Sequence, residues 1–335
     1  MIPERRFTWR DGERLILFRD GALDDAAGEL EARGWARFEL LTTPRALAEA
    51  PIELPERART VHEVPAGPVT ETAAAVIDSV TVPTLVALGG GRVIDTAKAI
   101  AAVRGGRVAA IPTTLSGAEM TRIHRLPEGR EAPHRVRPAL VLADPEAMTS
   151  LPENDLRPSA INALAHGIEP LYARFANPVA TLAALRGAEL IAGALDQPPA
   201  GRDRAGLALG SLLSAYALDS AGLALHHIVC QSLVRTMRIP HAPTYAAMLP
   251  RTIEAMRPRA PAAVAAAAGA VGARADAIGE RLEALAGGRR RLSEIGADRA
   301  RIDAAVDAML ARPELEATPQ PPGRDELVAL VESAW

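Results

Sequence analysis

Three segments in the second half of the chain carry the side chains best suited to polar chemistry. They are Asn162-Ala163-Leu164-Ala165-His166, His226-His227 and Pro240-His241. Asn162 and His166 are four residues apart, so on a helix they share a face. Imidazole nitrogens can bind a divalent metal such as iron or zinc. The alternative is that each histidine caps a helix or fills a polar gap, because the segments form one site only if the fold brings them together.

A glycine-rich turn in the first half has the pattern of a phosphate-binding site. The apolar run 86–88 leads into Gly89-Gly90-Gly91, and a segment with helical spacing follows. Glycine permits positive φ and close approach of the backbone, and a helix N-terminus attracts an anion. We interpret the turn as the binding site of a dinucleotide diphosphate. A tight turn without any ligand is the alternative.

The segments around this turn alternate between strand and helix patterns. Helices are expected at 23–34, at 69–79 and after the glycines, and strands at 14–19, 37–42, 60–64, 85–88, 108–111 and 140–143. Such alternation predicts a parallel sheet with helices on both faces, whose ligands bind at the carboxyl ends of the strands.

The second half shows only helical periodicity. The expected helices cover 179–195, 204–236, 262–286, 299–310 and 324–335, and loops are expected at 287–291 and 314–322. A chain of 335 residues is long enough for two hydrophobic cores. The sequence therefore predicts two domains, an α/β dinucleotide-binding domain at 1–150 and an all-helical domain for the substrate or metal at 151–335.

Charge and composition favour a small-molecule partner. The net charge is −3 with both signs intermingled, so we expect neither nucleic acid nor a membrane surface as a partner. The single cysteine, Cys230, excludes an intramolecular disulfide, and the start lacks the apolar core of a secretion signal. No uninterrupted apolar run is long enough to span a membrane. We expect a cytoplasmic protein.

Two motifs together resemble a known family. Gly-Gly-Gly-x-x-x-Asp-x-x-Lys at 89–98, followed by Ile-Pro-Thr-Thr-x-Ser-Gly-x-Glu at 111–119, resembles the nucleotide-binding half of the iron-containing alcohol dehydrogenase superfamily. The second half of the chain resembles its maleylacetate reductase branch. The resemblance implies a Rossmann-like α/β domain and an all-α domain, the fold that dehydroquinate synthase shares. It also implies an NAD(P)H cofactor and a homodimer.

The resemblance assigns roles on the cofactor side. Gly89, Gly90 and Gly91 would hold the diphosphate and Asp95 would help to place the nicotinamide, while Thr113, Thr114 and Ser116 would run along the nucleotide. Arg92 replaces the usual serine and suits a diphosphate, a 2′-phosphate or an acidic substrate. Thr42 ends a strand where an acid would hold the ribose hydroxyls, so both NADH and NADPH remain open.

On the catalytic side the resemblance also exposes departures from the family. The positions that match its metal ligands are Asn162, His166, His227 and His241, with asparagine in place of aspartate. Losing that negative charge predicts weaker binding of a divalent metal, so we do not expect the metal to be essential.

The family's histidine facing the nicotinamide is replaced by Gln231, which cannot act as a general acid or base. Tyr245 and His226 are our hypotheses for the residue that takes its role.

The leading hypothesis is an NAD(P)H-dependent reductase. Hydride would pass to a carbonyl or activated double bond of a small, anionic oxo acid held in the cleft between the domains. One alternative is a lyase or cyclase that uses NAD only transiently, as dehydroquinate synthase does. The other is a binding protein without catalytic activity, since fold alone does not determine function.

Overall fold

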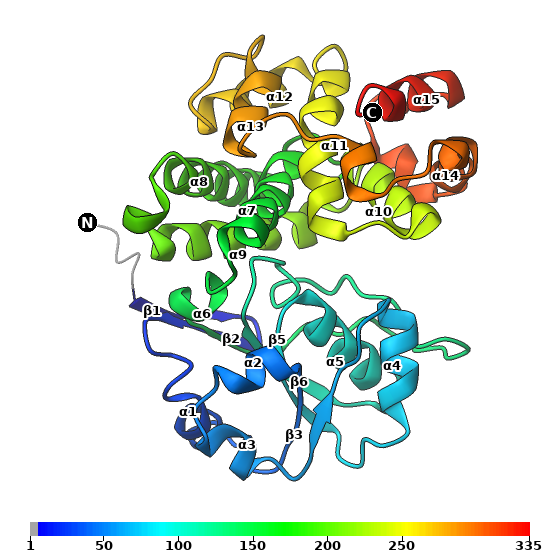
Figure 1. Cartoon of the computed structure of the whole chain (residues 1–335). Coiled ribbons are helices and arrows are strands. Elements are labelled where there is room, and N and C mark those ends of the chain that lie inside the picture. Colours follow the sequence, from blue (N-terminus) through cyan, green and yellow to red (C-terminus); the bar gives the residue numbers. More distant parts are fainter. Residues whose placement is uncertain (1–5) are drawn as a thin grey trace. The chain divides into compact units, whose positions relative to one another are not determined.

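The structure is a computed structural model that describes residues 6–335, and the chain forms two compact units (Figure 1). The first contains the chain up to Leu151 together with Arg204–Leu209, and the second contains Pro152–Asp203 with Gly210–Trp335. The first unit is an α/β fold and the second is helical, which confirms the predicted fold class.

The first unit is built on a sheet that has seven strands in the described part of the chain, ordered β1-β2-β7-β6-β5-β3-β4. The strands are β1 (Arg6–Asp11), β2 (Arg14–Arg19), β3 (Glu39–Thr42), β4 (Val61–Glu63), β5 (Thr84–Gly89), β6 (Arg107–Pro112) and β7 (Leu140–Ala143).

All neighbours in this sheet are parallel except β1 and β2, which form an antiparallel hairpin around Gly12 at φ +62°. Strand β1 is not among the strands expected from the sequence. Its side chains alternate between exposed and half-buried, so it lacks the continuous apolar run from which the other strands were predicted.

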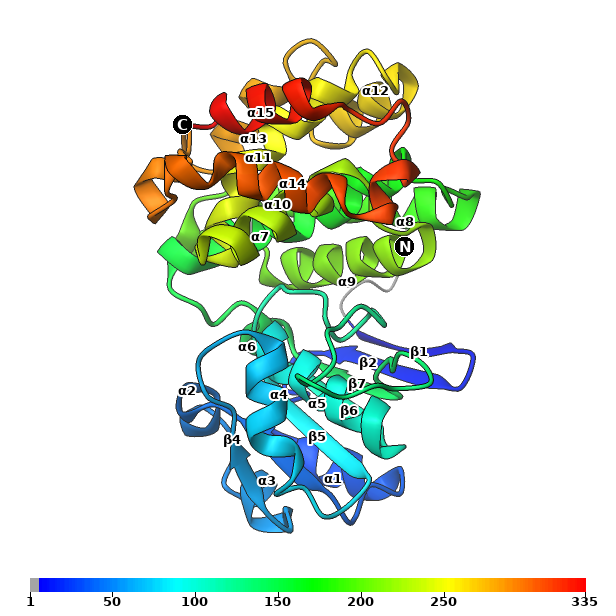
Figure 2. The ribbon, with the colours of Figure 1, turned by 90° about the vertical axis from the view of Figure 1, so that its right-hand side faces the viewer.

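Helices cover both faces of the sheet. They are α1 (Ala26–Ala32), α2 (Pro44–Ala48), α3 (Glu53–Arg57), α4 (Val69–Ile77), α5 (Gly91–Arg104) and α6 (Pro145–Met148). Helices α4 and α5 lie side by side (Figure 2) and share a core with Leu85 and Ala87 of β5. The alternate residues Val86 and Leu88 belong to a second core, which includes Leu30 of α1. A strand buried on both faces explains the continuous apolar run.

The connections reverse direction between β3 and β5. The chain passes from β3 to β4 on one side, and from β5 through β6 to β7 on the other. Open α/β sheets bind ligands at such a switch point, outside the carboxyl ends of the strands. Thr42 and Gly89 stand at these two ends, so the topology places both predicted cofactor residues where a nucleotide would bind.

The second unit is made of helices joined by turns and short 3-10 segments. Its helices are α7 (Glu153–Ile168), α8 (Pro178–Leu195), α10 (Leu225–Met237), α11 (His241–Met256), α12 (Pro261–Ala270), α13 (Ile278–Leu285), α14 (Ile302–Leu310) and α15 (Arg324–Glu332), with most of α9 (Arg204–Ala221).

Glycines let three of these helices approach closely. A Cβ on Gly187 of α8 would lie 2.4 Å from the Ser214 hydroxyl of α9, and one on Gly167 of α7 would lie 3.1 Å from the Ala184 carbonyl of α8. The close packing of α7 fixes the helix that carries Asn162 and His166.

Several expected helix boundaries differ from the structure, and three of these differences are described here. The segment 204–236 is not one helix, because Gly222 at φ +87° separates α9 from α10 and the two differ in direction by 99°. The segment 262–286 also divides, because α12 ends at Ala270, just before Gly272 at φ +73°, and α13 begins only at Ile278. The helix expected at 23–34 begins only at Ala26. Left-handed glycines end helices, whereas apolar periodicity continues across the break.

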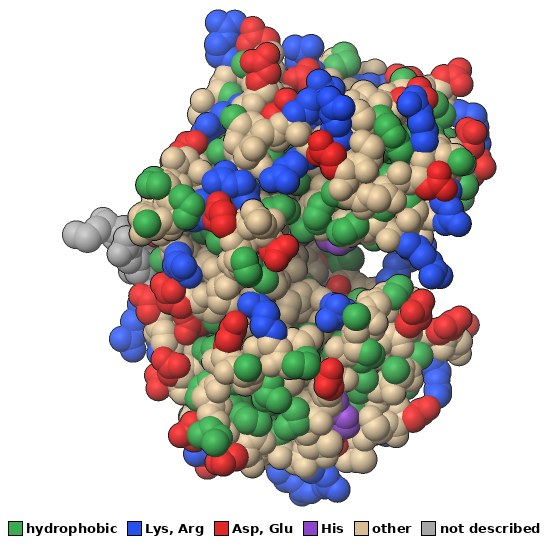
Figure 3. All heavy atoms as spheres, in the orientation of Figure 1, with side chains coloured by type: hydrophobic (Ala, Val, Ile, Leu, Met, Phe, Trp, Pro, Cys, Tyr) green, Lys and Arg blue, Asp and Glu red, His purple; other side chains and the backbone are tan. Residues whose placement is uncertain are grey.

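The surface mixes charges of both signs, as Figure 3 shows for one face. By length and composition alone, α8 is apolar enough to cross a bilayer, and 44% of it is buried inside the fold. It contains Arg186 and Glu189, which pair at 2.8 Å. Burial of one face in this way is what an amphipathic helix on the surface of a folded domain shows.

Candidate functional site

The glycine turn joins the end of β5 to the start of α5. Gly89 has φ +156°, and a Cβ there would lie 2.7 Å from Val93, so only glycine fits. Gly90 is the N-cap of α5, and no side chain caps this helix. The first amides of a helix have no partner within it. This uncapped end of a 14-residue helix therefore fits an anion such as a diphosphate.

The segment that follows β6 packs directly against the turn. A Cβ on Gly90 would lie 2.9 Å from Thr114 Cγ2, and a Cβ on Gly91 would lie 2.9 Å from Ser116 Cβ. The Thr113 amide donates to the Gly89 carbonyl at 3.0 Å. The structure thus brings the predicted cofactor residues together. It also gives Gly90 and Gly91 a packing role in addition to the ligand-binding role inferred from the sequence.

The other predicted cofactor residues differ in their surroundings. Arg92 is exposed on the first turn of α5, and Thr42 is buried at the end of β3. Asp95 accepts a hydrogen bond from Lys98 at 2.7 Å. Burial raises the pKa of Asp95, while the neighbouring Lys98 opposes the rise.

Lys98 also donates to the carbonyls of Ala118 and Ile123, each at 2.9 Å, so its ammonium group is fully used in fixing the segment after β6.

Glu119 is a buried carboxyl group that has no role among the predicted site residues. It is 0% exposed, and neither of its oxygens accepts a hydrogen bond from another described residue. Burial raises its pKa to about 7, although the charges of Lys98 and Arg14 oppose the rise. In the sequence, its position in the Ser-Gly-x-Glu motif could have marked Glu119 as a candidate site residue.

The second unit brings the three histidine segments together. Helix α7 carries His166, α10 carries His227, and α11 carries His241 and Tyr245. The ring centroids are 5.1 Å apart for His166 and His227, 5.2 Å for His227 and Tyr245, and 4.2 Å for His241 and Tyr245. These residues, with Asn162, are called the histidine cluster below.

Four polar atoms of the histidine cluster are buried without a partner among the described residues. They are Asn162 Oδ1, His166 Nδ1, His227 Nε2 and the Tyr245 hydroxyl. An unsatisfied buried polar group costs about 1–3 kcal/mol. Four such atoms in one cluster indicate a site that a polar ligand completes.

Glu169, which is not among the predicted site residues, orients His227. Its carboxylate is hydrogen-bonded to His227 Nδ1 and accepts the His227 backbone amide at 3.2 Å and the Ala224 amide. Burial raises the pKa of Glu169 to about 7, while these amides oppose the rise. With a proton on Nδ1, His227 Nε2 presents a lone pair. Glu169 lies three residues after His166, a spacing that could have revealed it.

The metal positions implied by the resemblance are not assembled as a cation site. Among residues 6–335, no group of three or more His, Cys, Asp and Glu side chains is placed to hold a metal ion. Asn162 contributes no charge, and the His241 ring packs against Tyr245 at an angle of 31°. A carboxylate behind a histidine is common at metal sites, but here it supports only His227. With asparagine in place of a carboxylate, the buried lone pairs of Asn162, His166 and His227 bring no negative charge for a divalent cation, and they suit the hydrogen-bond donors of a polar organic ligand.

The two hypotheses for the proton donor differ in geometry. His226 is fully buried, its Nδ1 lies 2.9 Å from the Thr252 hydroxyl, and burial lowers its pKa to about 3. Burial raises the pKa of Tyr245 well above its usual value, and the adjacent Gln231 and Arg312 oppose the rise without giving its hydroxyl a hydrogen bond of good geometry. Because its hydroxyl has no partner among the described residues, Tyr245 is the better candidate for the proton donor.

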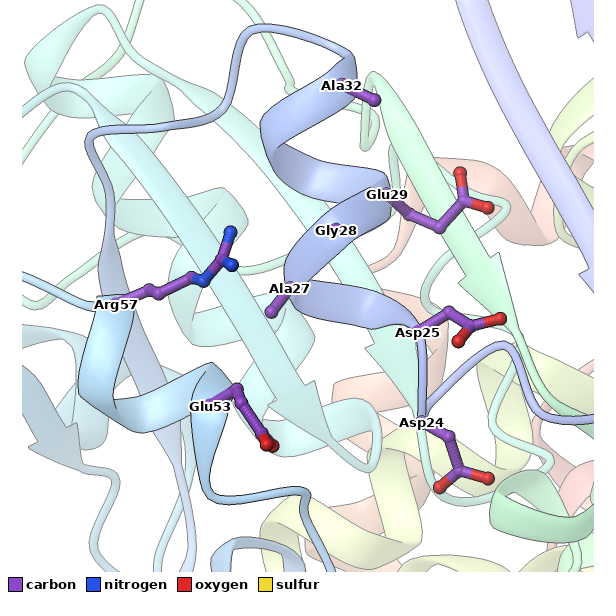
Figure 4. A pocket seen from close by; sticks show the side chains of 8 residues that line it. All are labelled: Asp24, Asp25, Ala27, Gly28, Glu29, Ala32, Glu53 and Arg57. Carbon is purple, nitrogen blue, oxygen red and sulfur yellow. The ribbon is translucent and has the colours of Figure 1, made fainter.

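A separate hollow of about 420 Å³ lies on the first unit between α1 and α3 (Figure 4). It is lined by acidic side chains, including Asp25 and Glu29, both paired with Arg19. None of the predicted nucleotide-binding residues lines it, so we do not assign the cofactor to this hollow.

Two family models match this chain. The family model for iron-containing alcohol dehydrogenase matches residues 14–145, and the model for the C-terminal part of that family matches residues 158–335.

Curated relatives are maleylacetate reductases. Maleylacetate reductase 2 of Cupriavidus pinatubonensis is 34% identical over 265 residues, which is 74% of this chain and 73% of that protein. Maleylacetate reductase 1 of Rhodococcus opacus is 34% identical over 276 residues, 80% and 77% of the two chains.

Solved structures agree with the sequence matches. The crystal structure of maleylacetate reductase from Agrobacterium tumefaciens covers 100% of this chain and 99% of its own, with a TM-score of 0.83 and 29% identity. Together these findings show that the chain belongs to the iron-containing alcohol dehydrogenase family of NAD(P)-dependent oxidoreductases, in its maleylacetate reductase-like branch.

Proposed function

We propose that this chain is an NAD(P)H-dependent reductase of a small oxo acid whose double bond is conjugated to a ketone. The observation that carries the proposal is the histidine cluster, where four buried polar atoms have no hydrogen-bond partner among the described residues and would gain one from a polar ligand. The names of the relatives support a substrate like maleylacetate. The uncapped α5 helix beside Gly89–Gly91 is where the cofactor's diphosphate would bind.

The chemistry defines what the residues must do. When bound, NAD(P)H would supply the hydride for the carbon β to the ketone, and a proton at the α carbon would complete the saturated C–C bond. Negative charge develops on the ketone oxygen during this addition, so a fixed hydrogen-bond donor lowers the barrier. Because its raised pKa keeps Tyr245 protonated, its hydroxyl is suited to donate to that oxygen.

The acceptors of the histidine cluster suit a second task. His227 Nε2 and Asn162 Oδ1 are buried lone pairs without donors, and Glu169 fixes the orientation of the His227 ring. A substrate hydroxyl, an enol or a bound water would satisfy them. They would thereby orient the ligand and hold the proton that the reaction consumes.

The test measures NADH and NADPH oxidation at 340 nm with maleylacetate, in the presence of a metal chelator. We expect one NAD(P)H consumed per substrate, and at least a tenfold lower kcat in Tyr245→Phe with little change in cofactor affinity. Turnover of substrate with the cofactor retained would instead support the lyase or cyclase alternative. No cofactor binding at all would refute the reductase.

We also propose that the chain binds two partners, a small anionic substrate and a second copy of itself. Light scattering on the purified protein tests the dimer, for which we expect twice the mass of one chain.

A further inference from the structure

Arg312 contacts the residue that replaces the family's nicotinamide-facing histidine. It follows α14 and precedes the 3-10 segment Pro313–Ala317. Its side chain is only 11% exposed, and its Nη1 donates to Gln231 Oε1 at 2.7 Å. This bond fixes which end of the Gln231 carboxamide faces Arg312. A buried arginine in this place adds a permanent positive charge next to a neutral glutamine.

The remaining donors of Arg312 contact the half-exposed carboxylate of Glu314. Nη2 and Nε lie 3.2 and 3.3 Å from the Glu314 oxygens, longer than the 2.7–2.9 Å or so of strong charge-assisted bonds. The Glu314 side chain is 47% exposed, so water competes for it. Arginine presents a planar fork that matches a carboxylate, and the fork here is only loosely occupied.

A second arginine adds to the positive charge. Burial lowers the pKa of Arg235 on α10, the nearby charge of Arg312 lowers it further, and Glu314 opposes both effects. One half-exposed carboxylate therefore faces two guanidinium groups. An excess of positive charge in a partly buried place favours an incoming anion.

Arg312 also lies close to the histidine cluster. Burial lowers the pKa of His227 and the Arg312 charge adds to that effect, whereas the same charge opposes the rise that burial causes in the pKa of Tyr245. These are the residues whose Nε2 and hydroxyl lack partners among the described residues. A ligand that filled the cluster would thus have a guanidinium group within electrostatic reach. Nothing in the sequence singled out Arg312, since 81 positions separate it from Gln231.

We propose that Arg312 binds a carboxylate of the substrate, with Gln231 holding the guanidinium in place and Glu314 occupying the fork until the substrate displaces it. This inference rests on the proposed function, because it assumes an anionic substrate at the histidine cluster. It makes Arg312 a substrate-binding residue and Gln231 a positioning residue.

The two partners of this ion pair should respond in opposite directions. The probe is succinate binding measured by calorimetry, with the neutral isostere succinamide as a comparison. We expect Arg312→Gln to raise the Kd of succinate by about 10- to 100-fold, and Glu314→Gln to lower it severalfold, with no change for succinamide. Arg299→Gln, at an exposed arginine that pairs with Glu332, is the matched control and should change neither.

Kinetics with maleylacetate provide a second readout. Arg312→Gln should raise KM much more than it lowers kcat, and Arg312→Lys should recover part of the loss by restoring the charge. Circular dichroism and the melting temperature check that each variant folds. If Arg312→Gln and Glu314→Gln change the Kd of succinate in the same direction, the ion pair is structural and the proposal is refuted.

Three further outcomes distinguish the sources of the anion and separate the two proposals. If Arg312→Gln weakens the binding of NADPH but not the binding of NADH or succinate, the arginine holds a cofactor phosphate, and the proposal is wrong. Wild-type protein that binds no succinate, with an unchanged KM in Arg312→Gln, also overturns it. Succinate binding that depends on Arg312, without any NAD(P)H oxidation by maleylacetate, would support Arg312 as a carboxylate-binding residue and refute the proposed function.

Discussion

Replacing Glu119 by glutamine should change how stability depends on pH in the first unit. Glu119 is 0% exposed and receives no hydrogen bond from another described residue. Its pKa is raised to about 7 from an ordinary 4.5, and burial is the largest cause. The folded chain therefore binds this proton more tightly than the unfolded chain does.

The sign and the size of the effect follow from proton linkage. A carboxyl whose folded pKa is raised contributes stability that is complete below the unfolded pKa and is lost as pH rises through the folded value. The window here runs from 4.5 to about 7. At about 1.4 kcal/mol per pH unit, ionising Glu119 should cost the folded state about 3 kcal/mol by pH 8.

The assay compares urea denaturation of wild type and Glu119→Gln between pH 4 and pH 8. Trp9 and Trp35 lie in the first unit and Trp335 in the second, so a Trp335→Phe background reports on the first unit alone. We expect the variant to gain about 3 kcal/mol relative to wild type on going from pH 4 to pH 8. A constant offset between the two is expected from the glutamine amide, which is itself buried.

A difference between the variant and wild type that does not vary with pH would refute this reasoning. It would mean that Glu119 ionises as easily in the folded chain as in the unfolded one, and hence that water or a neighbouring cation satisfies its charge. Glu71→Gln, at an exposed position on α4, is the control and should show no comparable pH dependence.

Two other predictions concern the same unit. Gly90→Ala places a Cβ 2.9 Å from Thr114 Cγ2, so it should lose about 1–3 kcal/mol in urea denaturation. Thr114→Ala should restore most of that loss in the double variant, and equal losses with and without Thr114 would contradict the packing argument. Burial lowers the pKa of His124 to about 4, and His124 Nε2 accepts the Val136 amide at 3.1 Å. Because that folded pKa lies below the unfolded value, the stabilisation is present above pH 6.5 and is lost as pH falls through 4. Hydrogen-exchange protection of the Val136 amide should fall accordingly, and an unchanged protection factor at pH 4 would count against it.

The sequence by itself determined the fold class, most of the strands and the location of the cofactor turn. Apolar runs such as 85–88 mark strands buried on both faces, and this signal is local. The predicted strand 140–143 agrees with β7. The motifs at 89–98 and 111–119 likewise belong to contiguous segments, so their residues can be identified from the order of amino acids alone.

Only the tertiary structure decided which distant groups meet. Glu169 beside His227, Arg312 beside Gln231 and the unpartnered atoms of the histidine cluster depend on helices that are far apart in the sequence. The break at Gly222, which turns α10 away from α9, is equally invisible to apolar periodicity. Burial and charge, which set the pKa of Glu119 and the loose occupancy of Arg312, are properties of packed surroundings rather than of residue type.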